Sequence, residues 1–158
     1  MRNPPGLAKA LALLVPAAAL AVAFGSQYLG GLVPCEMCWW QRYAHIAALA
    51  LGLLALVAGG RPLVWLAALA IAVSGGIGFY HAGVELDYFE GFTQCTSTVA
   101  AGGSTEDFLK AIMNASMVRC DDIQWSFLGI SMAGWNAIFS LGSALTILWL
   151  SLRKPRAA

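Results

Sequence analysis

Four long apolar segments constrain the fold of this chain more than any other feature of its sequence. They cover residues 7–26, 39–58, 63–80 and 129–152. A helix needs about 20 mostly apolar residues, with a range of roughly 17–25, to cross the hydrocarbon core of a bilayer, and such a helix satisfies its own backbone groups in lipid. Charged residues make up only 11% of the chain, against about 25% in a soluble domain. The sequence therefore predicts an all-α membrane protein, a four-transmembrane-helix bundle that forms one integral membrane domain over residues 1–158.

The first segment shares some features with a cleavable secretory signal. Arg2 and Lys9 precede an apolar run that ends near the small residues 21–23, which is the order found in signal peptides. The run is longer than the apolar region of a signal, however, and Pro16 lies in its middle, where a membrane helix tolerates proline. We therefore expect this segment to remain as the first transmembrane helix.

Basic residues are distributed unevenly between the two sides of the predicted bundle. With four spans, both termini and the short turn at 58–63 lie on one side, which carries six of the nine basic residues: Arg2, Lys9, Arg61, Arg153, Lys154 and Arg156. All eight acidic residues lie on the other side: Glu36, Glu85, Asp87, Glu90, Glu106, Asp107, Asp121 and Asp122. Because basic residues concentrate in cytoplasmic loops, we expect both termini in the cytoplasm. The net charge of +1 gives no reason to expect a nucleic-acid partner.

All four cysteines are predicted to lie on the outer side of the membrane. Cys35 and Cys38 form a CxxC motif at the outer end of the second span, while Cys95 and Cys120 lie in the long outer loop 83–128. Disulfides persist outside the cytoplasm. Four cysteines allow three sets of pairs. Pairing Cys35 with Cys38 and Cys95 with Cys120 is the simplest, because each bridge then closes its own loop.

Two other uses of the cysteines remain open at this point. Four cysteines can hold zinc in a tetrahedral site, although Cys95 and Cys120 are much further apart than the close pair that usually completes one. The bridges can also be purely structural, as most disulfides of exported proteins are. We expect no metal site, and structural disulfides remain an alternative to redox chemistry.

Arg42 favours a redox role for the CxxC motif. If the second helix begins near Cys38, Arg42 lies one turn further along the same face, and a helix N-terminus and an arginine both stabilise a thiolate. His45 follows on the same stripe. Each residue has a structural alternative, since an arginine at a helix end can extend to the membrane surface and a histidine can serve helix packing.

The third span brings a second histidine toward the motif. The sequence GFYHAG places His81 at the outer end of this span, so that His81 approaches Cys38 if spans two and three are antiparallel neighbours. Small residues recur at every fourth position, at Ala70, Ser74, Gly78 and Ala82. Such a stripe lets helix backbones approach closely, and we expect it to form a packing face.

The outer segment is acidic and predicted to be hydrated. Residues 83–124 carry seven acidic and two basic side chains, a net charge of −5. Ser104, followed three residues later by Asp107, resembles the start of a helix. Apolar residues then recur at helical spacing, at Phe108, Leu109, Ile112 and Met113. We expect a short amphipathic helix here, lying at the membrane interface, with packing on the bundle as the alternative.

Taken together, these motifs resemble those of the disulfide bond formation protein B (DsbB) family of bacterial inner-membrane oxidoreductases. The resemblance covers nearly the whole chain. It rests on PCEMCWWQR at the start of the second span, YHAG at the end of the third, the two later cysteines, and CDDIQWSFLG before the fourth. CxxC alone is a weak signal, whereas this ordered combination is specific.

The resemblance implies a membrane thiol-disulfide oxidoreductase. In such a protein, Cys95 and Cys120 would form the disulfide that reoxidises a periplasmic thioredoxin-fold, DsbA-type oxidase, with Cys95 forming the mixed disulfide. Electrons would then pass to Cys35 and Cys38, and Cys38 would meet a bound ubiquinone or menaquinone.

The resemblance also implies which residues bind the quinone and where the protein resides. Arg42 would hold a carbonyl oxygen of the quinone and stabilise the Cys38 thiolate, and His81 would lie near the quinone. The protein would be a multi-pass component of the bacterial inner membrane, with its cysteines on the periplasmic side.

Two alternatives give the cysteines other roles. A vitamin K epoxide reductase-like enzyme also joins quinone chemistry to two cysteine pairs, but in that family the loop pair precedes the CxxC motif, which is the reverse of the order here. A non-enzymatic membrane scaffold with two structural disulfides would lose stability, and no quinone turnover, when Cys38 is replaced.

Overall fold

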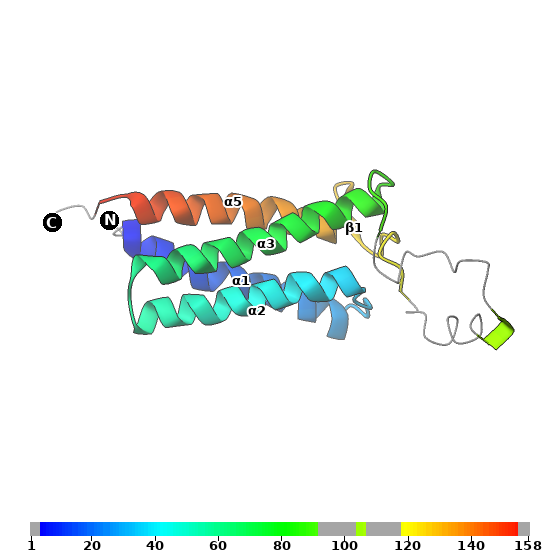
Figure 1. Ribbon diagram of the computed structural model, residues 1–158, viewed down its shortest axis with the longest axis horizontal. Helices are drawn as coiled ribbons and strands as arrows, with labels where there is room; N and C mark the ends of the chain where they lie inside the picture. The colour runs from blue at the N-terminus through cyan, green and yellow to red at the C-terminus, as the bar shows by residue number, and fades with distance from the viewer. Residues whose placement is uncertain (1–3, 92–103, 107–117, 155–158) are drawn as a thin grey trace.

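Four long helices form the body of the protein. The computed structural model describes residues 4–91, 104–106 and 118–154. Its long helices are α1 (Pro4–Tyr28), α2 (Glu36–Val57), α3 (Arg61–Glu85) and α5 (Met132–Leu152). Each is long and apolar enough to cross a membrane. The structure thus confirms the predicted four-helix membrane bundle (Figure 1).

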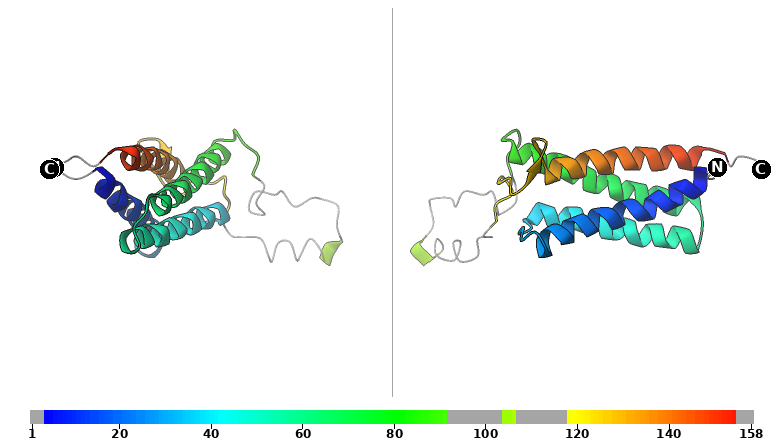
Figure 2. Two further views of the ribbon diagram at one scale, coloured as in Figure 1. Left: turned by 60° about the vertical axis from the view of Figure 1, so that its left-hand side comes forward. Right: turned by 180° about the vertical axis from the view of Figure 1, so that it is seen from behind.

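The helices lie side by side along one long axis (Figures 1 and 2). α3 packs against both α2 and α5, while α1 packs mainly against α2 and α5. Both termini and the turn between α2 and α3 lie at one end of the bundle (Figure 1). The opposite end carries residues 29–35, 86–91 and 118–131, and is called the loop end below.

Small residues allow the helices to approach closely at two crossings. A Cβ atom added at Gly52 of α2 would lie 2.6 Å from the carbonyl oxygen of Ala12 in α1. One added at Gly78 of α3 would lie 2.9 Å from the carbonyl oxygen of Ala133 in α5. Gly78 and Ser74 are both buried, which confirms the predicted packing face of the third span at these positions.

The core near the termini consists of small and medium-sized apolar side chains, whereas larger ones face outward. The core residues are Ala8, Ala12, Ala48, Ala55, Val64, Ala67, Ala68, Ile71, Ala144, Ile147 and Leu150. Leu14, Leu53, Leu69 and Phe139 are among the exposed large side chains. This distribution suits a lipid environment, where helices associate through close packing rather than through hydrophobic burial.

All four helix boundaries at the loop end differ from the predicted ones, and α1 ends at Tyr28, two residues past its predicted end. α2 begins at Glu36, three residues before the predicted start, because Cys35 caps the helix by accepting a hydrogen bond from the Cys38 N–H. α3 continues to Glu85, five residues past its predicted end, so the start of the predicted outer loop is helical. α5 begins at Met132, three residues later than predicted.

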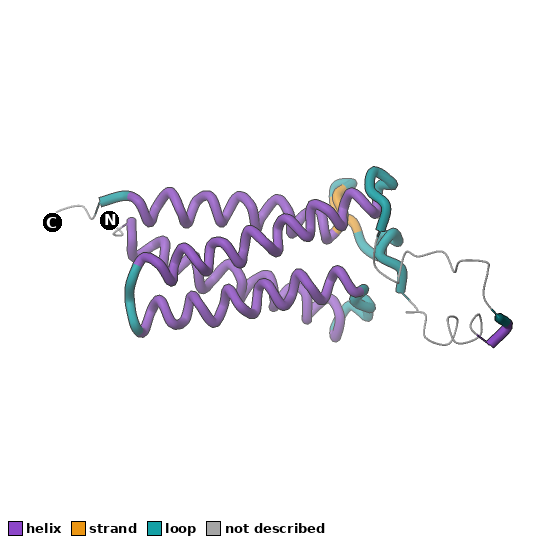
Figure 3. Tube along the Cα trace, in the orientation of Figure 1, coloured by secondary structure: helices purple, strands orange, loops and turns teal. Residues whose placement is uncertain are grey.

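A short β-hairpin explains the late start of α5. Its antiparallel strands are β1 (Ser126–Phe127) and β2 (Ile130–Ser131). They lie at the loop end of the bundle, beside the ends of the long helices (Figure 3). The turn residues Leu128 and Gly129 have φ angles of 54° and 76°, as a two-residue hairpin turn requires. Ser131 then caps α5, since its side chain accepts a hydrogen bond from the first turn of the helix.

Two predicted features lie outside the described residues. Cys95 is one, and most of the predicted interfacial helix is the other, since the structure describes only residues 104–106 of that segment. Both remain predictions.

Candidate active site

Three cysteines meet at the loop end of the bundle. Cys35 and Cys120 are buried and Cys38 is half-buried, and all three pack with Met37 and Val84 in one apolar cluster. Cys35 immediately precedes α2, and Cys38 lies in the first turn of that helix. The fold therefore places one cysteine of the outer loop directly beside the CxxC motif.

The two cysteines of the CxxC motif differ in their surroundings. The Cys35 thiol donates to Cys38 Sγ at 3.0 Å, and the Cys38 N–H donates to Cys35 Sγ at 3.3 Å. A hydrogen bond with Cys120, the hydrogen bond with Cys38 and burial together raise the pKa of the Cys35 thiol above its ordinary value. Cys38 lies at the helix N-terminus, where the peptide dipoles favour negative charge. Cys38 is thus the better placed of the two to carry a thiolate.

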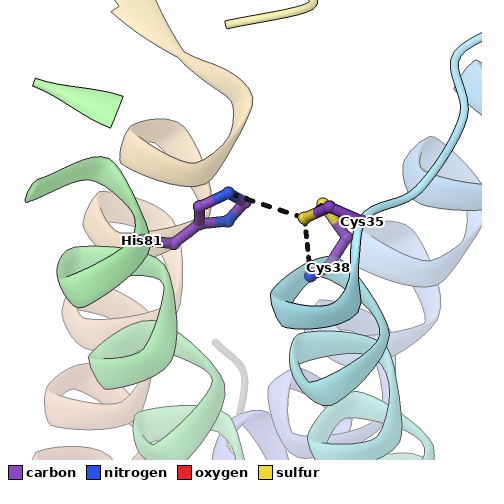
Figure 4. Close-up of side chains that lie close together, drawn as sticks. All are labelled: Cys35, Cys38 and His81. Carbon is purple, nitrogen blue, oxygen red and sulfur yellow. Dashed lines mark hydrogen bonds between the residues drawn. The ribbon is translucent and has the colours of Figure 1, made fainter. Parts of the chain in front are cut away.

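His81 lies between the CxxC motif and Cys120. Its Nε2 atom is 3.6 Å from Cys35 Sγ and 3.1 Å from the carbonyl oxygen of Cys120, and Figure 4 shows the ring directed at Cys35. The ring is buried, because α3 continues beyond the predicted end and carries His81 inside the bundle. The predicted approach of His81 to the motif is confirmed, and its nearest sulfur atom among the described contacts is that of Cys35.

Glu85 contributes a buried carboxylate beside this histidine. Its Oε1 atom lies 3.8 Å from His81 Nε2, and the exposed fractions of the two side chains are 7% and 4%. The Ser131 hydroxyl donates a hydrogen bond to the other carboxylate oxygen. The cap residue of α5 thereby holds the last residue of α3 in place.

The segment that carries Cys120 forms polar contacts both with the residues before the CxxC motif and within itself. Gln124 forms hydrogen bonds with the backbone of Val33, just before the CxxC motif. Arg119 donates hydrogen bonds to the Asp121 carboxylate. These hydrogen bonds hold the pKa of Asp121 below its ordinary value and raise that of Arg119.

Arg42 lies one helical turn after Cys38, as predicted, and is held by α1. Its Nη1 donates to Gln27 Oε1 at 2.5 Å, and its Nη2 donates to the Ala23 carbonyl oxygen at 2.9 Å. The guanidinium carbon also lies 4.9 Å from the ring centres of Phe24 and Trp39. Within the described part of the chain, neither ion pair involves Arg42, so its charge is stabilised by aromatic rings and neutral acceptors.

A polar network crosses the bundle next to the cysteines, on the side away from the loop end. It consists of Gln41, His45, Ser74, Asn136 and Ser140, from α2, α3 and α5. His45 Nε2 lies 3.0 Å from Asn136 Oδ1, and His45 Nδ1 is buried without a hydrogen-bond partner among the described residues. His45 thus connects α2 with α5, in line with the packing interpretation.

A cavity of about 930 Å³ opens between α1 and α5 and reaches the cysteines. Its lining includes Cys35, Cys38, Arg42 and His81, and apolar side chains of α1 and α5 form much of the remainder. The volume lies near the top of the range of roughly 300–1,000 Å³ that is usual for small-molecule sites. A flat, largely apolar molecule with polar edges, such as a quinone, fits this combination of apolar walls, a thiol and a guanidinium.

The same donors are also compatible with a metal ion. Cys35 Sγ, Cys38 Sγ and a ring nitrogen of His81 all lie within 4.8 Å of one another, and sulfur and imidazole are ligands that Zn²⁺ takes. A structural zinc site, however, does not account for the adjacent cavity or for a buried arginine next to the sulfur atoms.

The structure brings together most of the predicted site residues and adds others. Cys35, Cys38, Arg42, His81 and Cys120 gather at one end of the cavity. Sequence reasoning missed Gln41, Glu85, Gln124 and Asn136. Gln41 and Gln124 lie in the motifs PCEMCWWQR and CDDIQWSFLG, which carry the resemblance but gave these two residues no role. Glu85 and Asn136 are isolated polar residues with partners in other elements.

Comparison with known proteins agrees with the family resemblance of the sequence motifs. The model of the family described as "Disulfide bond formation protein DsbB" matches residues 6–150. Relatives named "Disulfide bond formation protein B" include those of Marinobacter nauticus, 31% identical over 91% of this chain and 90% of the relative, and of Paracidovorax citrulli, 32% identical over 95% and 90%. The relative from Xanthomonas campestris pv. campestris is 32% identical over 92% of this chain and 91% of its own length. No solved structure matches the chain.

Proposed function

The chain belongs to the DsbB family of membrane proteins that form disulfide bonds, and we propose that it reoxidises a periplasmic thioredoxin-fold, DsbA-type dithiol oxidase and passes the electrons to a membrane quinone, ubiquinone or menaquinone. One observation carries the proposal: Cys120 meets Cys35 and Cys38 at the end of an apolar cavity that also contains Arg42. This arrangement joins a thiol exchange site to a site for a lipid-soluble acceptor.

The first step takes place at the outer pair, Cys95 and Cys120. A thiolate of the partner attacks Cys95, the bond between Cys95 and Cys120 breaks, and Cys120 leaves as a thiolate. A mixed disulfide then joins the partner to Cys95. The second thiol of the partner later resolves this mixed disulfide, so that the partner leaves oxidised.

The second step moves the electrons from Cys120 to Cys38. The Cys120 thiolate attacks Cys35, the disulfide between Cys35 and Cys38 breaks, and the electron pair remains on Cys38 as a thiolate. The contact of Cys120 with Cys35 supports this order, and the helix N-terminus at Cys38 favours that residue as the leaving group.

The third step uses the residues that line the cavity. Before it, the Cys95 thiolate that remains when the partner leaves attacks Cys120, which restores the outer disulfide and releases Cys35 as a thiolate. Cys35 and Cys38 could then re-form their own disulfide and give two electrons and two protons to a bound quinone, which would leave as the quinol. Arg42 can bind a carbonyl oxygen of the quinone and stabilise the Cys38 thiolate, because its charge faces no carboxylate among the described residues and it lines the same cavity as Cys38. His81 lines this cavity as well, which allows a role at the quinone.

The charge distribution supports the proposed location. Lys9 lies in the first turns of α1, Arg61 begins α3, and Arg153 and Lys154 follow α5. These parts of the helices lie at the same end of the bundle (Figure 1), and basic residues concentrate on the cytoplasmic side. We therefore place both termini in the cytoplasm of a bacterium and the cysteines on the periplasmic face of the inner membrane.

Quinone reduction by the purified protein tests this function. A reduced thioredoxin-fold dithiol protein serves as the donor, and the wild type is compared with Cys38→Ser. We expect quinone-dependent turnover in the wild type and none in the variant. Absence of turnover with either quinone class, in protein shown to be folded, would contradict the proposal.

A further inference from the structure

His81 contacts both groups of cysteines at once. Its Nε2 lies 3.1 Å from the Cys120 carbonyl oxygen and 3.6 Å from Cys35 Sγ. A carbonyl oxygen can only accept a hydrogen bond, so this contact requires a proton on Nε2. The His81 side chain is only 4% exposed, which protects the hydrogen bond from competition by water.

Gln41 determines which nitrogen of the His81 ring carries the proton. Gln41 Nε2 donates to the Met37 carbonyl oxygen at 3.2 Å and lies 3.0 Å from His81 Nδ1. The Met37 carbonyl accepts only, so the amide nitrogen of Gln41 must face it and the ring. His81 Nδ1 is therefore the acceptor, and the neutral ring carries its proton on Nε2.

Asn136 determines the orientation of Gln41 in the same way. Its Nδ2 donates to Gln41 Oε1 at 2.7 Å and to the Ser74 carbonyl oxygen at 3.1 Å. The Ser74 carbonyl again accepts only, which orients the Asn136 amide. Hydrogen bonds thus run in one direction from α5 through α2 and α3 to the backbone of Cys120.

We propose that His81 is a positioning residue for exchange between the two cysteine pairs, and that it holds Cys120 against Cys35 through the Cys120 carbonyl while Gln41 and Asn136 set its tautomer. The inference rests on the proposed function and concerns its second step, in which the bond from Cys35 to Cys38 breaks, the bond from Cys35 to Cys120 forms, and the electron pair stays on Cys38. His81 orients one reactant in this step without gaining or losing a proton. This role differs from the quinone contact that the family resemblance implies.

The test measures how strongly Cys35 and Cys120 favour a disulfide with each other. Cys38→Ser and Cys95→Ser are combined so that these two thiols remain, and their effective concentration is obtained by equilibration with a glutathione redox buffer. Adding His81→Leu should lower the effective concentration about tenfold, which corresponds to about 1.4 kcal/mol. Gln41→Leu should lower it in the same direction. His81→Gln should keep most of the wild-type effective concentration, because the glutamine side-chain amide can donate to the same carbonyl.

His45→Leu is the matched control, since His45 is equally buried and lies beyond Asn136 in the same network. It should leave the effective concentration unchanged. The inference fails if His81→Leu and Gln41→Leu leave the effective concentration unchanged. It also fails if His81→Gln lowers the effective concentration as much as His81→Leu does. A fall with His45→Leu as large as that with His81→Leu or Gln41→Leu would overturn it as well.

A second assay separates this inference from the proposed function. A small dithiol can reduce the disulfide between Cys35 and Cys38 directly, so quinone reduction driven by it does not need Cys120. With all four cysteines present, His81→Leu should slow quinone reduction by the thioredoxin-fold donor about tenfold more than reduction by the small dithiol. Equal slowing with both donors would overturn the positioning role. Failure of wild-type turnover would instead overturn the proposed function.

Discussion

Gln124 is joined to Val33 by two hydrogen bonds with its side-chain amide. The Val33 N–H donates to Gln124 Oε1 at 3.1 Å, and Gln124 Nε2 donates to the Val33 carbonyl oxygen at 2.8 Å. Val33 lies two residues before Cys35, and Gln124 lies four residues after Cys120. The pair therefore connects the two segments whose cysteines must react, and it does so independently of His81.

Replacement of Gln124 should weaken the link between the cysteine pairs. Gln124→Ala removes two hydrogen bonds worth roughly 0.5–1.5 kcal/mol each, so we expect quinone reduction by the thioredoxin-fold donor to fall by about tenfold. Gln124→Glu keeps the acceptor and loses the donor, and should give an intermediate rate. Stopped-flow measurement of quinone absorbance provides the rates. Equal rates for all three proteins would show that Gln124 has no part in the exchange.

Arg42→Ala should impair quinone binding and leave the outer exchange intact. A hydrogen bond to a charged group contributes roughly 1.5–3 kcal/mol, so we expect the KM for quinone to rise at least about tenfold. Arg42→Lys keeps the charge but loses the planar arrangement of donors, so its KM for quinone should lie between those of the wild type and Arg42→Ala. The rate of mixed-disulfide formation between Cys95 and the partner serves as the internal control. Unchanged quinone kinetics in Arg42→Ala would contradict the role assigned to this residue.

Gly78→Ala should destabilise the bundle at the crossing of α3 and α5. The new Cβ would lie 2.9 Å from the Ala133 carbonyl oxygen and 3.0 Å from Asn136 Nδ2, and overpacking of this kind costs about 1–3 kcal/mol. Gly76→Ala in the same helix is the matched control, because nothing lies within 4 Å of its added Cβ. Denaturant unfolding in detergent should show a loss of stability for Gly78→Ala alone. A similar loss in both variants would refute the close-approach explanation.

Acid should loosen the segment around Cys120. Arg119 holds the pKa of Asp121 below the ordinary value of 3.8. A depressed folded-state pKa contributes stability above the unfolded pKa, and this contribution disappears as pH falls through the folded pKa. The exposed fractions of the two side chains are 65% and 26%, so the effect should be small and local. Amide hydrogen exchange of residues 118–122, corrected for its intrinsic pH dependence, should rise in acid. Asp121→Asn should abolish this rise, and an unaltered rise would exclude Asp121 as its source.

Hydropathy and motif spacing were sufficient to predict the four spans, the position of the CxxC motif at one end of α2, and the approach of His81. These features depend on local sequence, because span length and helical periodicity place side chains without knowledge of the neighbouring helices. The sidedness of the bundle remains a prediction.

The loop-end boundaries could not be predicted in this way. His81 and Glu85 look like residues beyond the end of a span, yet both are buried because Gln41 and Ser131, from other elements, satisfy them. Ser126 pairs with Ser131 in a hairpin whose last residues, 129–131, hydropathy assigns to the start of the fourth span. Gln41, Glu85 and Asn136, whose partners include residues of other elements, were missed.

The most direct measurement is identification of the disulfides present during turnover. Wild-type protein with bound quinone is mixed with the reduced thioredoxin-fold donor, quenched with acid at successive times, alkylated, digested and examined by mass spectrometry. A peptide pair linked through Cys35 and Cys120 should appear after the donor is mixed with the protein and decay as quinol accumulates. Quinol formation without this linked pair, with the donor instead found attached to Cys35, would contradict the transfer of electrons from Cys120 to the CxxC motif.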